Sequence, residues 1–328
     1  MAEPRFDVVG IGNAIVDVLA HADEDFLIRF DLNKGAMTLI DSDRAAALYE
    51  NMAPAVECSG GSVANTIACL ASLGGAGAFI GKVHDDQLGT IFRHDIRALG
   101  IDFGTKPSTG GAPTARCLIF VTPDAERTMQ TFLGACAELS PADIDPDVIA
   151  AAKVTYLEGY LWDPPGAKEA FIAAADLAHD AGRSVALSLS DPFCVDRYRD
   201  EFRDLVERHI DIVFANEEEI CSLYQVKTFD AALQHVRGHC RIAALTRSEK
   251  GSVIVSGDEV HVIDAEPVER VVDTTGAGDA YAAGFLYGLT HGKPLPDCAR
   301  LGGIASAEVI SHVGARPETP LNTLAAKV

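Results

Sequence analysis

A short turn near the C-terminus combines glycines with a carboxylate. Residues 273–279 have the sequence Asp-Thr-Thr-Gly-Ala-Gly-Asp, and an Ala-rich helical pattern begins within the turn. Free N–H groups at a helix start carry partial positive charge, and glycines let an anion approach them without a Cβ in the way. Asp279 could accept a proton from a hydroxyl group that attacks the terminal phosphate of a nucleotide. The turn therefore indicates phosphoryl transfer, although an ordinary strand-to-helix turn would also favour an acidic residue there.

Alternating strand and helix patterns surround this turn. Buried strands are predicted at residues 6–11, 76–80, 154–158, 184–188, 211–214 and 242–246. Parallel strands require crossovers such as the helical patterns between these runs. Residues 101–133 interrupt the rhythm with predicted strands at 115–121 and 128–132. We expect one domain over residues 1–328, with a small β lid made by insertions at about 14–41 and 101–133.

Composition limits the possible partners. The chain has 328 residues, 48% of them hydrophobic, and a formal net charge of −21, which disfavours nucleic acid as a partner. The eight cysteines show no zinc-ligand spacing. There is no secretory signal pattern, and no apolar run approaches the roughly 20 residues that span a bilayer. We expect a cytoplasmic enzyme without a membrane partner, as a monomer or a homodimer.

Two N-terminal segments could bind a polyol. Asn13 and Asp17 follow the first predicted strand, and their side chains could bind vicinal hydroxyl groups. The glycine pattern before them lacks its third glycine, because position 15 is Ile, so a dinucleotide site is not predicted. The Gly60-Gly61-Ser62 sequence begins a helical pattern that carries Asn65. Ordinary turn chemistry and a plain helix start are the alternatives.

Residues 273–285 resemble, almost letter for letter, the C-terminal signature of the ribokinase-like (PfkB) carbohydrate and nucleoside kinases. The 60–65 segment matches that family's G-G-x-x-N element. The resemblance implies an α/β fold, a three-layer α/β/α arrangement around a mostly parallel sheet with a small β-sheet lid. It also implies a catalytic base at Asp279 and an anion hole at Gly276, Ala277 and Gly278. Substrate hydroxyls would contact Asn13, Asp17, Gly60, Gly61, Ser62 and Asn65.

The same resemblance assigns ATP and Mg²⁺ sites. The implied ATP-binding residues are Asn216, Glu219, Thr246, Arg247, Gly251, Thr274, Thr275, Gly276 and Gly278. Glu219 would act on Mg²⁺ through water, as suits a cation that keeps its hydration shell. Ser248 replaces the first glycine of the family's T-x-G-x-x-G loop, which puts the backbone path there in doubt. Asp85 and Gly89 match a motif with a structural role, and activation by a monovalent cation stays open.

Shorter segments favour a nucleoside over a free sugar. Residues 127–136, 156–160, 188–193 and 211–217 look more like adenosine kinases than ribokinases. Arg127, Phe132 and Tyr160 are the substrate contacts expected from them, with Leu133 and Phe193 as further contact area or core. We therefore expect transfer of the ATP γ-phosphate to the 5′-hydroxyl of adenosine. A kinase for ribose, fructose or a related sugar and a non-catalytic nucleoside sensor are the alternatives.

Overall fold

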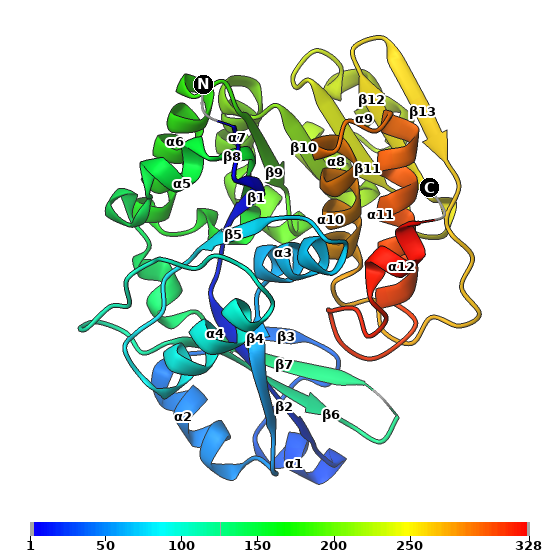
Figure 1. Cartoon of the computed structure of the whole chain (residues 1–328). Helices are drawn as coiled ribbons and strands as arrows, with labels where there is room; N and C mark the ends of the chain where they lie inside the picture. Colours follow the sequence, from blue (N-terminus) through cyan, green and yellow to red (C-terminus); the bar gives the residue numbers. More distant parts are fainter. Residues whose placement is uncertain (1–2, 125, 327–328) are drawn as a thin grey trace.

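The computed structural model describes residues 3–124 and 126–326. Its main sheet has eight strands in the order β13-β12-β11-β10-β9-β8-β1-β5 (Figure 1). The six strands from β11 to β5 are parallel, and β12 and β13 form an antiparallel hairpin at one edge. The strands are β1 (Phe6–Ile11), β5 (Gly77–Ile80), β8 (Ala152–Glu158), β9 (Ser184–Ser188), β10 (Ile212–Asn216), β11 (Ile242–Thr246), β12 (Ser252–Ser256) and β13 (Glu259–Ile263).

Helices cover both faces of this sheet. Neighbouring residues of a strand point to opposite faces, so Val8 packs in one core with Phe285, and Val9 packs in the other with Phe171. The first core includes α3 (Ser62–Ser72), α10 (Ala277–Thr290), α11 (Leu295–Val309) and α12 (Leu321–Ala325). The second includes α5 (Pro146–Ala150), α6 (Pro165–Asp180), α7 (Pro192–His209), α8 (Glu217–Tyr224) and α9 (Phe229–Val236). These three layers confirm the predicted fold class.

A second sheet of five strands, the lid sheet, lies below the main sheet in Figure 1, with the order β3-β7-β6-β2-β4. The strands are β2 (Ile15–His21), β3 (Met37–Leu39), β4 (Val56–Gly60), β6 (Ala115–Val121) and β7 (Arg127–Phe132). Its outer face is covered by α1 (Glu24–Arg29) and α2 (Ser42–Asn51). Phe26 of α1 packs against Phe120 at 4.9 Å between ring centroids, and Leu48 of α2 is fully buried.

The first lid insertion is longer than predicted. The expected range of about 14–41 omits β4, which pairs antiparallel with β2, so the insertion continues to Gly60. The sequence Val-Glu-Cys-Ser-Gly has no clear strand pattern, and only its pairing makes it a strand. The predicted start of the second insertion is also early, because Phe79 N of β5 donates to Asp102 O at 2.8 Å in the main sheet. The predicted domain range also contains residues 1, 2, 125, 327 and 328, which lie outside the described residues.

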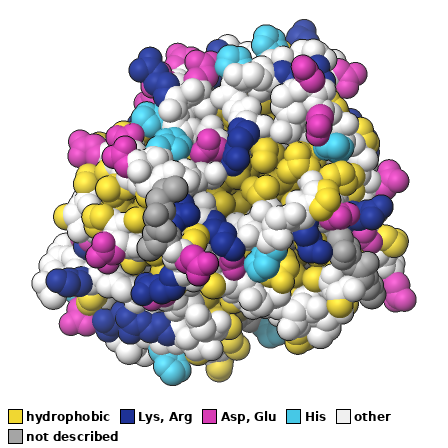
Figure 2. Space-filling view, turned by 45° about the horizontal axis from the view of Figure 1, so that its top comes forward, with side chains coloured by type: hydrophobic (Ala, Val, Ile, Leu, Met, Phe, Trp, Pro, Cys, Tyr) yellow, Lys and Arg dark blue, Asp and Glu magenta, His cyan; other side chains and the backbone are white. Residues whose placement is uncertain are grey.

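The surface is mixed in charge. On the face shown in Figure 2, Lys and Arg side chains are separated by acidic, apolar and uncharged ones over most of the area. This distribution agrees with the net charge of −21 and gives no continuous basic surface on that face. Across residues 3–124 and 126–326, no helix combines the length and apolar character needed to cross a bilayer.

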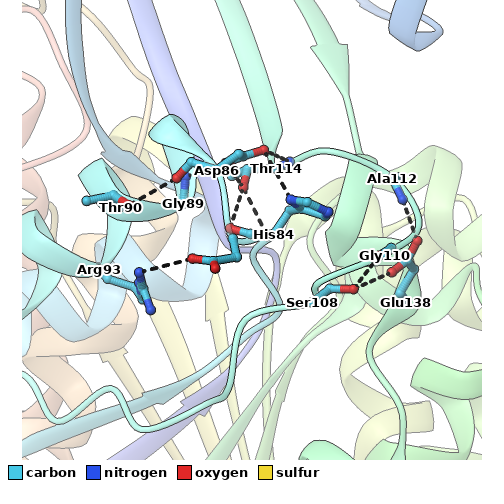
Figure 3. Close-up of polar contacts among 11 residues, drawn as sticks. His84, Asp86, Gly89, Thr90, Arg93, Ser108, Gly110, Ala112, Thr114 and Glu138 are labelled. Atoms are coloured by element: carbon cyan, nitrogen blue, oxygen red, sulfur yellow. Dashed lines mark hydrogen bonds and ion pairs between the residues drawn. The ribbon is translucent and has the colours of Figure 1, made fainter.

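The second lid segment is attached to the main domain at Thr114 (Figure 3). Thr114 Oγ1 donates to Asp86 Oδ1 at 2.6 Å, and its backbone N–H donates to Asp86 Oδ2 at 2.9 Å. Asp86 also caps α4 (Gln87–Ala98), because it accepts from Gly89 N at 2.8 Å. The carboxylate predicted from the sequence motif was Asp85, but Asp86 is the residue that makes these structural contacts. Asp85 instead lies at the surface, with its Oδ1 3.7 Å from Arg93 Nη2.

Asp86→Ala should lower the free energy of unfolding by about 2 kcal/mol, because the buried Thr114 donors and the first turn of α4 lose their acceptor. Urea denaturation followed by circular dichroism measures this loss. Asp85→Ala is the matched control and should change the free energy by less than about 0.5 kcal/mol. Equal effects of the two substitutions would contradict the role given to Asp86.

Candidate functional site

A cleft lies between the lid sheet and the carboxyl ends of the parallel strands. Its volume is about 1660 Å³, larger than the roughly 300–1,000 Å³ typical of a site for one small molecule. Asn13 follows β1, Glu158 ends β8, Asn216 ends β10 and Thr246 ends β11, and all four line the cleft. Ligands of open parallel sheets bind at this edge, so the strand order itself brings these polar residues together.

The 274–279 turn, called here the anion turn, forms one wall of the cleft. Gly276 is the N-cap of α10 with φ 77°, a conformation that favours glycine, and no side chain caps the N–H groups that follow it. A Cβ at Gly278 would contact nothing within 4 Å, so the backbone there is open to the cleft. The free N–H groups and the helix dipole make this turn suitable for binding a phosphate group.

Asp279 lies in the first turn of α10 and lines the cleft. Ser62 Oγ donates to Asp279 Oδ1 at 2.6 Å, which joins the start of α3 to the anion turn. Burial raises the pKa of the Asp279 carboxyl to about 7, against the lowering effect of hydrogen bonds from Ser62 and Asn65. Such a carboxyl group is partly ionised near neutral pH and can accept a proton from a nearby hydroxyl.

Glu158 connects the two segments predicted to bind a polyol. Its carboxylate accepts from Asn13 Nδ2 at 2.6 Å, from Asn13 N at 3.3 Å and from Val63 N at 2.9 Å. The side chain is 1% exposed, and burial raises its pKa to about 7 although these hydrogen bonds oppose the shift. No role for Glu158 followed from the sequence motifs. A carboxylate at the end of a fully buried strand was the signal that could have identified it.

The two glycines before α3 have different roles. Gly61 has φ 98°, and a Cβ there would lie 2.2 Å from the Asn13 carbonyl oxygen, so the two segments meet through bare backbone. A Cβ at Gly60 would lie 2.3 Å from Asp17 Oδ2, and Gly60 therefore supports Asp17 without lining the cleft. Asn13, Asp17, Gly61, Ser62 and Asn65 do line it, as the sequence predicted for a substrate subsite.

Asn216 and Glu219 form a reciprocal cap at the start of α8. Asn216 Nδ2 donates to Glu219 Oε1 at 2.6 Å, Asn216 N donates to Oε2 at 2.9 Å, and Glu219 N donates back to Asn216 Oδ1. Burial raises the pKa of Glu219 to about 7. Both residues line the cleft, so Glu219 fixes the orientation of Asn216 at the wall.

The 246–251 loop follows β11. Thr246, Ser248 and Gly251 line the cleft, and Ser248 takes the left-handed conformation with φ 51° at the position where the family pattern has glycine. Arg247 does not line the cleft, because its guanidinium bonds to Glu217 at 3.0 Å and lies 4.2 Å from the Phe229 ring centroid.

Besides Gly60, two more predicted substrate contacts lie outside the cleft lining. Arg127 of β7 pairs with Asp273 at 2.9 Å between Nη1 and Oδ2, directly before the anion turn. Thr131 and Leu133 line the cleft. Successive side chains of a strand point to opposite faces, so Phe132 between them points away from the cleft. Tyr160 does line the cleft and is 37% exposed.

Comparison with known proteins identifies the family. The family model described as pfkB family carbohydrate kinase matches residues 46–322. The chain belongs to the PfkB family. An adenosine kinase from Sinorhizobium meliloti has 55% identity and a TM-score of 0.91, with 98% of this chain and 99% of that chain covered. A probable sugar kinase from Rhizobium etli has 54% identity and the same TM-score, with 99% and 98% covered. Adenosine kinase 1 of Arabidopsis thaliana is 26% identical over 98% of this chain and 99% of its own length.

This PfkB kinase is thus a phosphotransferase with ATP as donor and an alcohol group as acceptor. Its cleft is strongly acidic, and the carboxylates that line it are Asp17, Glu158, Asp163, Asp191, Asp196, Glu219, Glu249, Asp264, Glu266 and Asp279. Arg197 is the one basic residue in the described lining, and it pairs with Asp163 at 3.1 Å. A triphosphate therefore needs the N–H groups of the anion turn and an accompanying cation.

The lid side of the cleft is mainly apolar, with Asp17 and Thr131 as its polar members. Six residues, called here the apolar lid face, line it from the lid sheet and the residue after β7: Ile15, Met37, Leu39, Ile119, Met129 and Leu133. Met37 is 51% exposed and Leu39 is 49% exposed. Tyr160 and Phe193 line the cleft from the main domain, and Phe193 is 78% exposed. Apolar side chains exposed to the same cleft from both domains indicate a ligand with a flat apolar part.

Asp279→Asn should raise the thermal midpoint of the ligand-free protein by about 2 °C at pH 8, because the substitution removes a charge that burial disfavours. The pKa of Asp279 is raised, so this cost appears as pH rises from the ordinary carboxyl range toward 7. The difference from the wild type should therefore shrink between pH 8 and pH 5. Differential scanning calorimetry measures it, with the exposed Asp200→Asn as control. An unchanged or lower midpoint at pH 8 would count against a desolvated Asp279.

Proposed function

We propose that this PfkB kinase transfers the γ-phosphate of ATP to the 5′-hydroxyl of adenosine, with AMP and ADP as products. The apolar lid face beside Asn13 and Asp17 is the observation that carries this proposal. The Sinorhizobium meliloti and Arabidopsis thaliana relatives named adenosine kinases support it.

A free sugar suits this cleft less well than a nucleoside. Sugars carry hydroxyl groups around the ring, and a hydroxyl that loses water without gaining a hydrogen bond costs roughly 1–3 kcal/mol. The six side chains of the apolar lid face offer no hydrogen-bond donor or strong acceptor. A purine base instead presents two flat faces to such a surface, while the ribose reaches the polar residues at the strand ends.

The residues of the cleft divide into three roles under this proposal. Asn13, Asp17 and Asn65 bind the ribose hydroxyls and orient the 5′-hydroxyl toward Asp279. The Asp279 carboxylate accepts the proton of that hydroxyl as its oxygen attacks the γ-phosphorus. The bond between the γ-phosphorus and the bridging oxygen breaks, and ADP leaves with the electron pair. The N–H groups of the anion turn bind the oxygens of the transferred group, where negative charge accumulates.

Mg²⁺ fits the residues present when it arrives with the triphosphate. Oxygen donors surround the cleft, but among the described residues no group of three acidic, His or Cys side chains is arranged to hold a metal ion. A cation that retains most of its water and binds mainly to phosphate matches that arrangement, with Asn216 and Glu219 on its water shell. The bound ion would neutralise phosphate charge in an acidic cleft.

The acceptor preference can be measured directly. Purified protein with ATP and Mg²⁺ should phosphorylate adenosine with kcat/KM at least about 100-fold higher than ribose or fructose, because only the nucleoside gains contact with the apolar lid face. Release of ADP in a coupled assay gives the rates, with inosine as a test of base selectivity. A higher kcat/KM for a free sugar would instead identify a sugar kinase. Adenosine binding by calorimetry without ADP release would identify a sensor.

Two variants refine this measurement. Leu39→Ser should lower kcat/KM for adenosine about ten-fold and leave the rate with ribose unchanged, because it removes apolar contact from the lid face. Ile28→Ser is the matched control, since Ile28 is 76% exposed on α1 and outside the cleft lining.

Activity should rise with pH through about 7. The raised pKa of Asp279 means that protonated enzyme predominates below this pH, and a protonated carboxyl group cannot accept the 5′-hydroxyl proton. We expect kcat/KM for adenosine to fall by up to ten-fold per pH unit below 7. Asp279→Asn should lower kcat by roughly 10²–10⁴-fold while KM for adenosine stays within about three-fold. Constant activity from pH 6 to 8, or near-normal turnover of the variant, would contradict the assignment of Asp279 as the base.

A further inference from the structure

The tripeptide Gly314-Ala315-Arg316 lies between α11 and α12 and contacts two separate parts of the cleft wall. Gly314 N donates to Asp273 Oδ2 at 2.9 Å, and a Cβ at Gly276 would lie 2.7 Å from the Ala315 Cβ. Arg316 Nε donates to Asn65 Oδ1 at 3.1 Å. Figure 1 shows this part of the chain, coloured red, beside α3. One short segment therefore touches the anion turn and the substrate subsite.

The Arg316 guanidinium is also held in place by an acidic residue. Its Nη1 lies 3.4 Å from Asp95 Oδ2 on α4. The same oxygen accepts from Ser59 N at 2.7 Å and from Ser59 Oγ at 2.5 Å, at the end of β4. The Arg316 side chain is 21% exposed, and its Nη2 is buried without a hydrogen-bond partner among the described residues. These contacts fix the guanidinium between α3, α4 and the end of β4.

Arginine only donates hydrogen bonds, so the atom of Asn65 that faces Arg316 must be the amide oxygen. The amide nitrogen then faces the opposite way, toward Asp279, where a hydrogen bond from Asn65 opposes the rise in the carboxyl pKa that burial causes. Without the guanidinium, the amide could rotate and present its oxygen to the carboxylate. We infer that Arg316 is a positioning residue for the nucleoside, one that fixes the Asn65 amide with its N–H groups directed into the cleft. This inference rests on the proposed function, because Asn65 is taken to bind the ribose.

Arg316 also acts on Asp17 through its charge. Burial raises the pKa of Asp17 to about 6, and Arg316 and then Arg127 oppose this shift. The other titratable groups facing Asp17 are the thiols of Cys58 on β4 and Cys117 on β6, its partners across the lid sheet. Burial raises the pKa of these thiols to about 11 and about 12, so they stay neutral. Arg316 therefore helps to keep Asp17 ionised as a hydrogen-bond acceptor for a hydroxyl group.

Arg316→Met tests the inference by separating the two substrates. The KM for adenosine should rise roughly 10- to 100-fold with the loss of the charge-assisted hydrogen bond, while the KM for ATP changes less than about three-fold. The acid limb of kcat/KM for adenosine should also move to higher pH. Arg316→Lys keeps the charge, so that limb should stay in place while KM takes an intermediate value. An unchanged KM for adenosine in both variants, or equal rises in both KM values, would overturn the inference.

A double-mutant cycle with Asn65→Ala shows whether Arg316 acts through Asn65. In the Asn65→Ala background, Arg316→Met should raise KM for adenosine by a smaller factor than in the wild type, because the amide to be oriented is gone and only the effect of the charge on Asp17 remains. Fully additive effects would overturn the inference. Arg300→Met is the matched control, since Arg300 is an exposed residue of α11 that pairs with Asp297.

Thermal melts verify folding of each variant. If Arg316→Met does not fold, Arg316→Lys takes its place in the comparison of KM values and in the cycle with Asn65→Ala. Wild-type protein that fails to phosphorylate adenosine refutes the proposed function. Wild-type protein that does so, with KM unaffected by Arg316→Lys and Arg316→Met, refutes this inference alone.

Discussion

The hydrogen bonds that the buried Glu158 carboxylate accepts determine the geometry of the cleft. A carboxylate that is 1% exposed must be hydrogen-bonded, and Glu158 takes its donors from Asn13 and Val63. Its own strand lies in the main sheet, whereas Asn13 precedes the lid and Val63 lies in the first turn of α3. Three segments far apart in the sequence are thereby fixed against one another. Ser62, next to Val63, then reaches Asp279 at 2.6 Å.

Carboxylate side chains line the cleft in which a highly charged anion has to bind. Burial raises the pKa values of Asp279, Glu158 and Glu219 to about 7. Ionisation of these groups therefore lowers the stability of the folded protein. The positive counterparts are the N–H groups of the anion turn and two arginines just behind the lining, Arg127 and Arg316. This arrangement favours an anion that arrives with its own cation.

Sequence patterns predicted the features that depend on local order. The strands at 115–121, 184–188 and 242–246 have the predicted bounds because apolar runs there are bounded by turn residues. The anion turn was recognisable for the same reason. Features that depend on contacts distant in sequence were missed. Pairing with β2 makes β4 a strand, and the roles of Asp86 and Glu158 depend on hydrogen bonds from Thr114 and Asn13. Phe132 was expected at the cleft from the resemblance of residues 127–136 to adenosine kinases and from its aromatic ring, whereas strand alternation assigns its neighbours Thr131 and Leu133 to the cleft.

The helices on the outer face of the lid sheet determine what that face offers to solvent. Phe26 and Leu48 bury apolar side chains of β2 and β6 that a bare sheet would expose to water. A sheet with one wet apolar face commonly needs a second copy of the chain to cover it. Here the cover is encoded in the same insertion, so this face of the lid sheet is buried within one polypeptide. Shielding that face from water therefore requires no second copy of the chain.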